Sequence, residues 1–158
     1  MHDENTAKPL ADLLAKYYIP EELKKIEANI VTDYPKQIIV MRQYFPDGKG
    51  GTKKLRIGKY VAQGCHASQL ALKEARLSDS PACWDWLNHS FAKIVLYVKT
   101  EQELLDLAKA VKAAGLPFGL VQDSGRTEFE GIPTYTALGI GPSYSSEIDP
   151  LTKHLPLF

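Results

Sequence analysis

Two short apolar runs with a helix signal between them constrain the fold of this chain most strongly. Residues 92–98 and 118–122 have the length and apolar character of buried strands. Between them, Thr100 followed by Glu103 is a capping-box pattern, and apolar residues then recur at helical spacing until Gly115. A strand, a helix and a second strand in this order predict an α/β fold.

The flanking segments extend this pattern. Residues 36–42 form another apolar run, a helix is expected from about residue 58 through residue 77, and residues 134–140 are expected to form a last strand that ends in a loop at 141–143. The predicted order is strand, helix, strand, helix, strand, strand, with a short helical or irregular segment after Pro81. The face of the first helix that is expected to pack on the sheet contains Val61, Cys65, Ser68, Leu72 and Ala75.

Composition indicates an ordinary globular protein. The 158 residues are 44% hydrophobic, and 19 Lys and Arg balance 19 Asp and Glu, so nucleic-acid binding would have to use a local patch. No apolar run approaches the roughly 18 residues of a membrane helix, and the polar N-terminus resembles no targeting peptide. With only Cys65 and Cys83, a cytoplasmic protein is expected.

The N-terminal segment differs from the rest of the chain. Leu10, Leu13, Leu14 and Tyr17 recur at helical spacing, and Pro20 is typical of a helix start. We therefore divide the chain into a helical extension, residues 1–35, and a main domain, residues 36–158.

A group of polar residues follows the strand at 118–122. Asp123, Arg126 and Thr127 supply an acid, a cation and a hydroxyl around a flexible Ser-Gly pair. Ligands of open α/β sheets bind at the carboxyl ends of strands, so this loop is a candidate site. A capped turn with a solvated arginine is the alternative interpretation.

The helix that begins near residue 58 carries a second candidate group. Lys59, Gln63 and His66 lie within about 60° of one another on its surface. The preceding loop is basic, and the start of a helix favours phosphate. The basic residues of this loop are Lys49, Lys53, Lys54 and Arg56. With Asp123, Thr127 and Thr136, these groups would fit hydrolysis without a metal.

Several other chemistries are not supported. The GKGGT sequence at 48–52 lacks the spacing of a nucleotide P-loop, and no GxSxG elbow is present. Cys65 and His66 are adjacent and would point about 100° apart on a helix, so a zinc site is not expected. We predict neither a metal nor a cofactor.

Four segments make the sequence similar to a known family. GKYVAQGCHAS at 58–68, QDSGRT at 122–127, TALGIGP at 136–142 and IDPLTKHLPL at 148–157 resemble the type 2 peptidyl-tRNA hydrolases, in the family's order. The resemblance implies a three-layer α/β/α sandwich with a four-stranded mixed sheet whose last strand is antiparallel. It also implies cleavage of the ester bond between a peptide and the 3′-terminal ribose of tRNA, with peptidyl-tRNA as the partner and a homodimer as an open option.

The resemblance also assigns residues to roles. The positions that match the family's active site are Lys59, His66, Asp123, Thr127 and Thr136. We assign substrate or tRNA binding to Gln63, Gln122 and Arg126 and to the basic residues Lys49, Lys53, Lys54 and Arg56.

One position departs from the family. Ile57 stands where the family usually has a first lysine of G-K-G-K, so a phosphate contact there would come from Arg56, Lys54 or Lys53, or be absent. A tRNA- or RNA-binding module without hydrolysis is therefore the alternative function. An interaction protein that recruits a partner through its N-terminal helices is a third.

Overall fold

The computed structural model describes residues 33–158, of which residues 35–158 form one unit with its own core. The helical extension predicted for residues 10–30 lies outside the described residues. The division of the chain at residue 35 stays a prediction.

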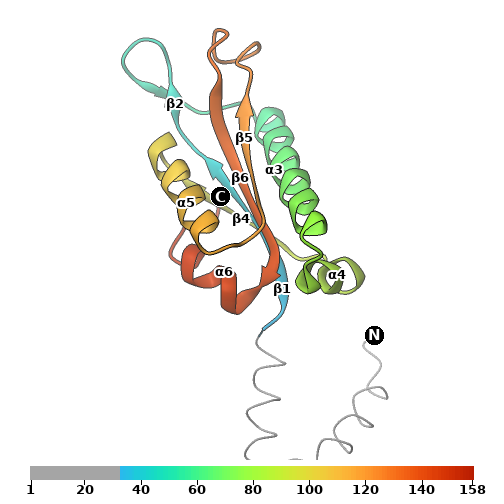
Figure 1. The fold of residues 1–158 in the computed structure, drawn as a ribbon. Coiled ribbons are helices and arrows are strands. Elements are labelled where there is room, and N and C mark those ends of the chain that lie inside the picture. The colour runs from blue at the N-terminus through green and yellow to red at the C-terminus, as the bar shows by residue number, and fades with distance from the viewer. Residues whose placement is uncertain (1–32) are drawn as a thin grey trace, which may run out of the picture. The chain divides into compact units, whose positions relative to one another are not determined.

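The described part alternates strands and helices in the expected order (Figure 1). The elements are β1 (Pro35–Arg42), β2 (Phe45–Pro46), β3 (Thr52–Lys53), α3 (Ile57–Leu77), α4 (Pro81–Asn88), β4 (Lys93–Val98), α5 (Glu101–Ala113), β5 (Phe118–Asp123), β6 (Thr134–Tyr144) and α6 (Ser145–Thr152). The capping box predicted for α5 is present, since Thr100 accepts from the Glu103 N–H and Glu103 accepts from the Thr100 N–H.

The main sheet has the mixed topology that the resemblance implied. Its strand order is β4-β1-β6-β5; β1 and β4 are parallel, and β6 runs antiparallel to both β1 and β5. In the part of the chain that the structure describes, β6 is the only strand of this sheet that runs opposite to the others. The predicted antiparallel last strand is therefore confirmed.

Helices cover both faces of this sheet, which makes three layers (Figure 1). Alternate residues of β1 point to opposite sides: Ile38 and Val40 join the core under α5 and α6, whereas Ile39 and Met41 join the core under α3. Every residue of β1 is buried, which agrees with the apolar run of residues 38–41 at its centre. The α/β/α fold class is confirmed.

The packing face of α3 differs from the prediction. The buried residues of this helix are Tyr60, Gln63, Ala67, Ala71 and Ala75, while Val61 is 60% exposed and Cys65 is also exposed. The reason is the close approach of α3 to Gly119 and Gly139 on adjacent strands, where a Cβ on Gly139 would lie 2.1 Å from the Ala67 carbonyl oxygen. Only the alanine face of the helix fits such a surface.

Three further segments differ from expectation. Strand β6 continues through residues 141–143, where a loop was predicted, because residues 143 and 144 still pair with β1. The loop between β1 and α3 contains the short β2–β3 hairpin, and α6 follows β6 without having been predicted. Pro150 inside α6 and the Gly-Pro pair in β6 are typical of loops, so local signals pointed away from both elements.

Candidate active site

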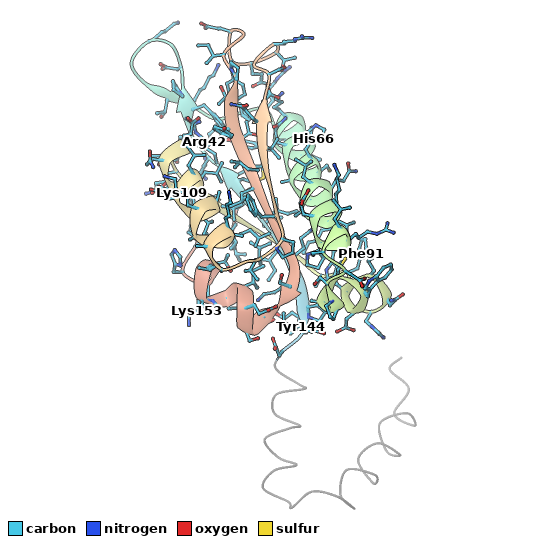
Figure 2. The ribbon with its side chains drawn as sticks, viewed as in Figure 1. Arg42, His66, Phe91, Lys109, Tyr144 and Lys153 are labelled. Carbon is cyan, nitrogen blue, oxygen red and sulfur yellow. The ribbon has the colours of Figure 1, made fainter. Side chains whose placement is uncertain are left out.

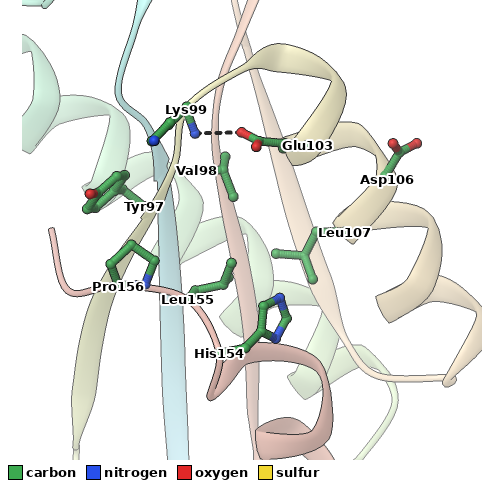
Figure 3. Close-up of a pocket in the computed structure, with 9 residues that line it drawn as sticks. All are labelled: Tyr97, Val98, Lys99, Glu103, Asp106, Leu107, His154, Leu155 and Pro156. Atoms are coloured by element: carbon green, nitrogen blue, oxygen red, sulfur yellow. Dashed lines mark hydrogen bonds between the residues drawn. The ribbon is translucent and has the colours of Figure 1, made fainter.

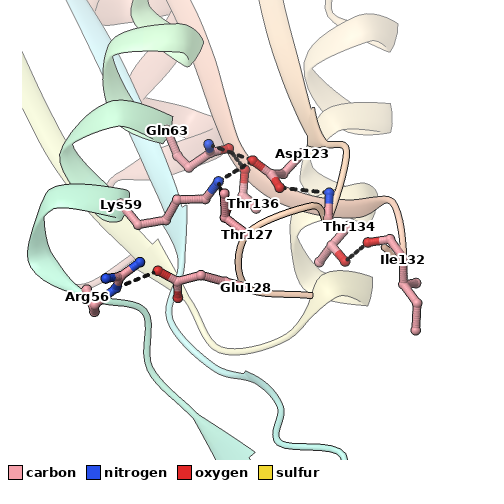
Figure 4. A network of polar contacts seen from close by, with 10 residues as sticks. Arg56, Lys59, Gln63, Asp123, Thr127, Glu128, Ile132, Thr134 and Thr136 are labelled. Atoms are coloured by element: carbon pink, nitrogen blue, oxygen red, sulfur yellow. Dashed lines mark hydrogen bonds and ion pairs between the residues drawn. The ribbon is translucent and has the colours of Figure 1, made fainter. Parts of the chain in front are cut away.

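Asp123 is the last residue of β5, and the first turns of α3 lie beside it (Figure 4). The Lys59 ammonium nitrogen is 2.5 Å from Asp123 Oδ2 and 3.2 Å from the Thr127 hydroxyl oxygen. Gln63 Nε2 donates to the same Asp123 oxygen at 3.1 Å. The rotation of α3 that buries its alanine face is what carries Lys59 and Gln63 to this edge of the sheet.

The turn after β5 holds the other oxygen of Asp123. The Gly125 N–H donates to Asp123 Oδ1 at 2.9 Å. Gly125 has φ +82°, and a Cβ there would lie 2.3 Å from the Ile132 carbonyl oxygen, so only glycine fits this turn. The glycine of the Ser-Gly pair is thus a fixed part of the site.

Asp123 is held as a carboxylate. Burial by itself would raise its pKa, but the hydrogen bonds from Lys59, Gly125 and Gln63 and the charge of Lys59 outweigh burial. The net effect places the pKa of Asp123 below its ordinary value of 3.8. At neutral pH the group is an anion that accepts hydrogen bonds and does not donate them.

This lowered pKa predicts a pH-dependent stability. The native pKa lies below the unfolded value, so the stabilisation is present above about pH 3.8 and is lost as the pH falls through the native pKa. We expect the free energy of unfolding, measured by urea denaturation, to be higher for wild type than for Asp123→Asn. This difference should be larger at pH 7 than at pH 3. The pKa values of Asp47 and Glu103 are also lowered, but both residues are present in both proteins. Their contributions to the pH dependence of the free energy of unfolding therefore cancel in the difference. A gap that is constant with pH would contradict the prediction.

Gln63 and Thr136 form a buried part of the same cluster. The Thr136 hydroxyl donates to Gln63 Oε1 at 2.5 Å, and Thr136 and Gln63 are 0% and 3% exposed respectively. The structure therefore brings together five residues that the sequence had singled out from three separate segments. They are Lys59, Gln63, Asp123, Thr127 and Thr136.

Three of the predicted site residues stand apart from this cluster. His66 lies on an exposed part of α3 (Figure 2), and Gln122 and Arg126 are also exposed. Within residues 33–158, none of these three side chains makes a polar contact with Lys59 or Asp123. Each remains accessible from solvent, so a role toward substrate stays a prediction.

The basic loop contacts a residue that sequence reasoning missed. Glu128 Oε1 accepts from Arg56 Nε at 2.9 Å, and the Glu128 carbonyl accepts from Lys53 at the same distance. Lys54 lies over the Tyr44 ring, and Lys49 is exposed. No local pattern marks Glu128, because its partners are more than 70 residues away in sequence.

The first turn of α3 contains no acidic residue. Its N-cap is Arg56, and no side chain caps the helix. Ile57, the position that departs from the family, is the first residue of α3 and is 82% exposed. The N–H groups at such a helix start and the helix dipole favour a phosphate.

A hollow on the α5 side of the sheet is a weaker candidate (Figure 3). It has a volume of about 470 Å³ and is lined by Tyr97, Lys99, Glu103 and His154 among others. Its Glu103 carboxylate already accepts the Lys99 and Thr100 N–H groups as the cap of α5. The Glu103 acid of this hollow is therefore committed to the helix cap.

Two further observations bear on the class of protein. Within residues 33–158, no three His, Cys, Asp or Glu side chains are grouped so that they could hold a metal ion. No helix of that same range is long and apolar enough to cross a membrane. An α/β/α domain with a lysine–carboxylate cluster at the carboxyl end of a strand has the groups of an acid–base enzyme suited to hydrolysis.

Comparison with known proteins identifies the family. Residues 35–158 match the family model described as peptidyl-tRNA hydrolase PTH2. Proteins named peptidyl-tRNA hydrolase are 44% identical in Methanopyrus kandleri and 41% identical in Methanococcus maripaludis strain C6, each over 77% of this chain and 97% of the relative. The relative from Methanocaldococcus jannaschii is 36% identical over 77% of this chain and 98% of its own length. The chain belongs to the type 2 peptidyl-tRNA hydrolase family.

Proposed function

We propose that this chain hydrolyses the ester bond of peptidyl-tRNA and releases free tRNA and peptide. The observation that supports this most directly is the Lys59–Asp123 pair at the end of β5, beside the uncapped start of α3. The pair supplies charge for ester hydrolysis, and the helix start and basic loop supply a place for tRNA phosphates. Family membership supports the same reaction.

The hydrogen-bond inventory of Asp123 suggests how water is held. A carboxylate offers about four acceptor positions. Lys59 and Gln63 use those on Oδ2, and Gly125 uses one on Oδ1, which leaves one position on Oδ1 for a water. Because its pKa is lowered, Asp123 orients this water toward the ester carbonyl carbon as a carboxylate.

Lys59 and Thr127 are placed to stabilise the oxyanion. An ammonium has three donors; Asp123 and Thr127 take two, so one can face the carbonyl oxygen of the substrate. Thr127 accepts from Lys59 and keeps its own hydroxyl proton for the substrate. In the net reaction the hydroxyl of water goes to the acyl carbon, and its proton goes to the ribose oxygen.

The direct test is cleavage of N-acetyl-aminoacyl-tRNA, with and without EDTA. We expect release of free tRNA at the same rate in both conditions. Binding of tRNA without cleavage would favour the RNA-binding module. Neither binding nor cleavage would favour an interaction protein.

The basic loop should make tRNA binding dependent on salt. Lys49 and Lys54 are exposed, so replacing either by glutamine should weaken binding similarly for different tRNAs. The slope of log K against log salt should fall by about one for each phosphate that the variant no longer binds, measured by filter binding. Lys153→Gln, in the exposed turn after α6 (Figure 2), is the matched control and should leave the slope unchanged. If Lys49→Gln and Lys54→Gln had the same slope as wild type and Lys153→Gln, the loop would be excluded from tRNA binding.

Location and assembly are also proposals. Cys65 and Cys83 are both free, which supports a reducing compartment such as the cytoplasm. A homodimer is proposed from the family resemblance alone, and light scattering of the purified chain would measure its mass.

A further inference from the structure

We propose that Gln63 and Thr136 form a positioning relay, in which the Thr136 hydroxyl orients the Gln63 amide and the amide in turn orients the Asp123 carboxylate. The relay rests on the proposed hydrolase function of the Lys59–Asp123 site. It gives both residues a role that differs from the sequence interpretation, in which Thr136 was catalytic and Gln63 bound substrate.

Burial separates these two residues from the substrate. Thr136 is 0% exposed and Gln63 is 3% exposed, whereas the Asp123 and Lys59 side chains are 12% and 17% exposed. A tRNA or a peptide can therefore reach the ion pair but not the relay. Gln63 and Thr136 must act through Asp123.

The donors and acceptors of the relay run in one direction only. An ionised carboxylate accepts and cannot donate, so Gln63 must turn its NH₂ group toward Asp123 Oδ2, at 3.1 Å. Its Oε1 then faces Thr136, whose hydroxyl donates at 2.5 Å. In the described residues, no buried side-chain polar atom of the relay or elsewhere lacks a partner. Loss of the Thr136 hydroxyl would leave Gln63 Oε1 buried without a donor.

A local irregularity of the sheet places Thr136 for this contact. Val121 pairs with Ala137 and Gln122 pairs with Tyr135, so Thr136 is an additional residue of β6 between these two pairs. Such a bulge redirects a side chain and is frequent next to active sites. The bulge sits directly before Asp123 and joins β6, α3 and β5 through one chain of hydrogen bonds.

The relay restrains the rotation of the Asp123 carboxylate. Gly125 holds Oδ1 from the backbone, but Lys59 has a flexible side chain and can follow a carboxylate that turns. Gln63 is buried and is itself fixed by Thr136, so it is the rigid donor to Oδ2. The plane of the carboxylate, and with it the direction of the bound water, depends on this donor.

The first test replaces the hydroxyl of Thr136 while keeping its shape. Thr136→Val should lower kcat about 10–100-fold with KM within about two-fold, because misorientation at the reacting centre costs rate and not binding. Thr136→Ser keeps the hydroxyl and should restore kcat. Thr152→Val removes another buried threonine hydroxyl, in α6, and should leave kcat unchanged. A Thr136→Val enzyme with normal kcat, a raised KM alone, or failure of serine to restore kcat would overturn the relay.

The second test is a double-mutant cycle. Gln63→Met removes the amide at similar volume, and combining it with Thr136→Val should lower kcat no further than Gln63→Met alone. Additive losses would show that the two residues act separately and would overturn the proposal. If Thr136→Val does not fold, Gln63→Met alone must still lower kcat about 10–100-fold. An unchanged kcat in Gln63→Met would overturn the relay.

A third measurement does not depend on activity. Carboxyl ¹³C NMR of Asp123 should show a higher pKa in Thr136→Val and in Gln63→Met than in wild type and in Thr152→Val. If the pKa of Asp123 is raised in both relay variants but wild type does not cleave the substrate, the proposed hydrolase function is refuted and the relay is still supported. An unchanged Asp123 titration in both relay variants would refute the relay even if wild type hydrolyses peptidyl-tRNA.

Discussion

Replacement of Asp123 by asparagine is expected to lower kcat for N-acetyl-aminoacyl-tRNA about 10²–10³-fold or more while the protein stays folded. The amide keeps the shape of the side chain but removes the anion that Lys59, Gln63 and Gly125 surround. Lys59 loses its anionic partner, and one of the two oxygens that accept hydrogen bonds becomes an NH₂ donor. Single-turnover kinetics with saturating enzyme would isolate this loss from substrate binding, and circular dichroism would report folding.

A matched control is available in a second ion pair. Lys36 and Asp149 also approach to 2.5 Å, between β1 and α6. Asp149→Asn should therefore keep kcat within about two-fold of wild type, although it removes the charge opposite a buried lysine and costs stability. If Asp123→Asn retained a rate close to that of Asp149→Asn, the assignment of the active site would be wrong.

The largest effect on stability is expected from Gly139→Ala. The new Cβ would lie 2.1 Å from the Ala67 carbonyl oxygen and 3.0 Å from the Ala71 Cβ, and backbone atoms cannot move aside as a flexible side chain can. We expect a loss of about 3 kcal/mol in the free energy of unfolding and a Tm lower by about 10 °C. Activity should fall as well, because α3 must shift away from β5 and carries Lys59 and Gln63 with it.

Gly64→Ala is the control for this substitution. Gly64 lies in α3 itself, and its added Cβ would be in ordinary contact with the Met41 sulfur at 3.6 Å. Because alanine favours the helix, the free energy of unfolding of the variant should equal that of wild type or exceed it by up to about 0.5–1 kcal/mol. Thermal unfolding followed by circular dichroism measures both variants. Equal Tm values for Gly139→Ala and wild type would mean that α3 does not lie directly on the two glycines.

Much of the fold follows from local sequence signals. The apolar runs at 36–42, 92–98 and 118–122 became β1, β4 and β5, and the Thr100–Glu103 capping box begins α5. These signals concern neighbours in sequence, so they can be seen in one chain. The errors arose where long-range packing outweighs local preference, as in β6 beyond residue 140 and in α6.

The sequence by itself determined which chemical groups the protein has and on which elements they stand: Asp123 after a strand, Lys59 and Gln63 at a helix start, and Thr136 on a strand. Only the tertiary structure decided how these groups meet. The glycine surface at Gly119 and Gly139 selects the alanine face of α3 and turns Gln63 inward, while His66 remains outside. The bulge at Thr136 then completes the contact to Asp123 through Gln63. The physical reason is that helical spacing defines which residues share a face, whereas steric fit against another part of the chain selects the face that is buried.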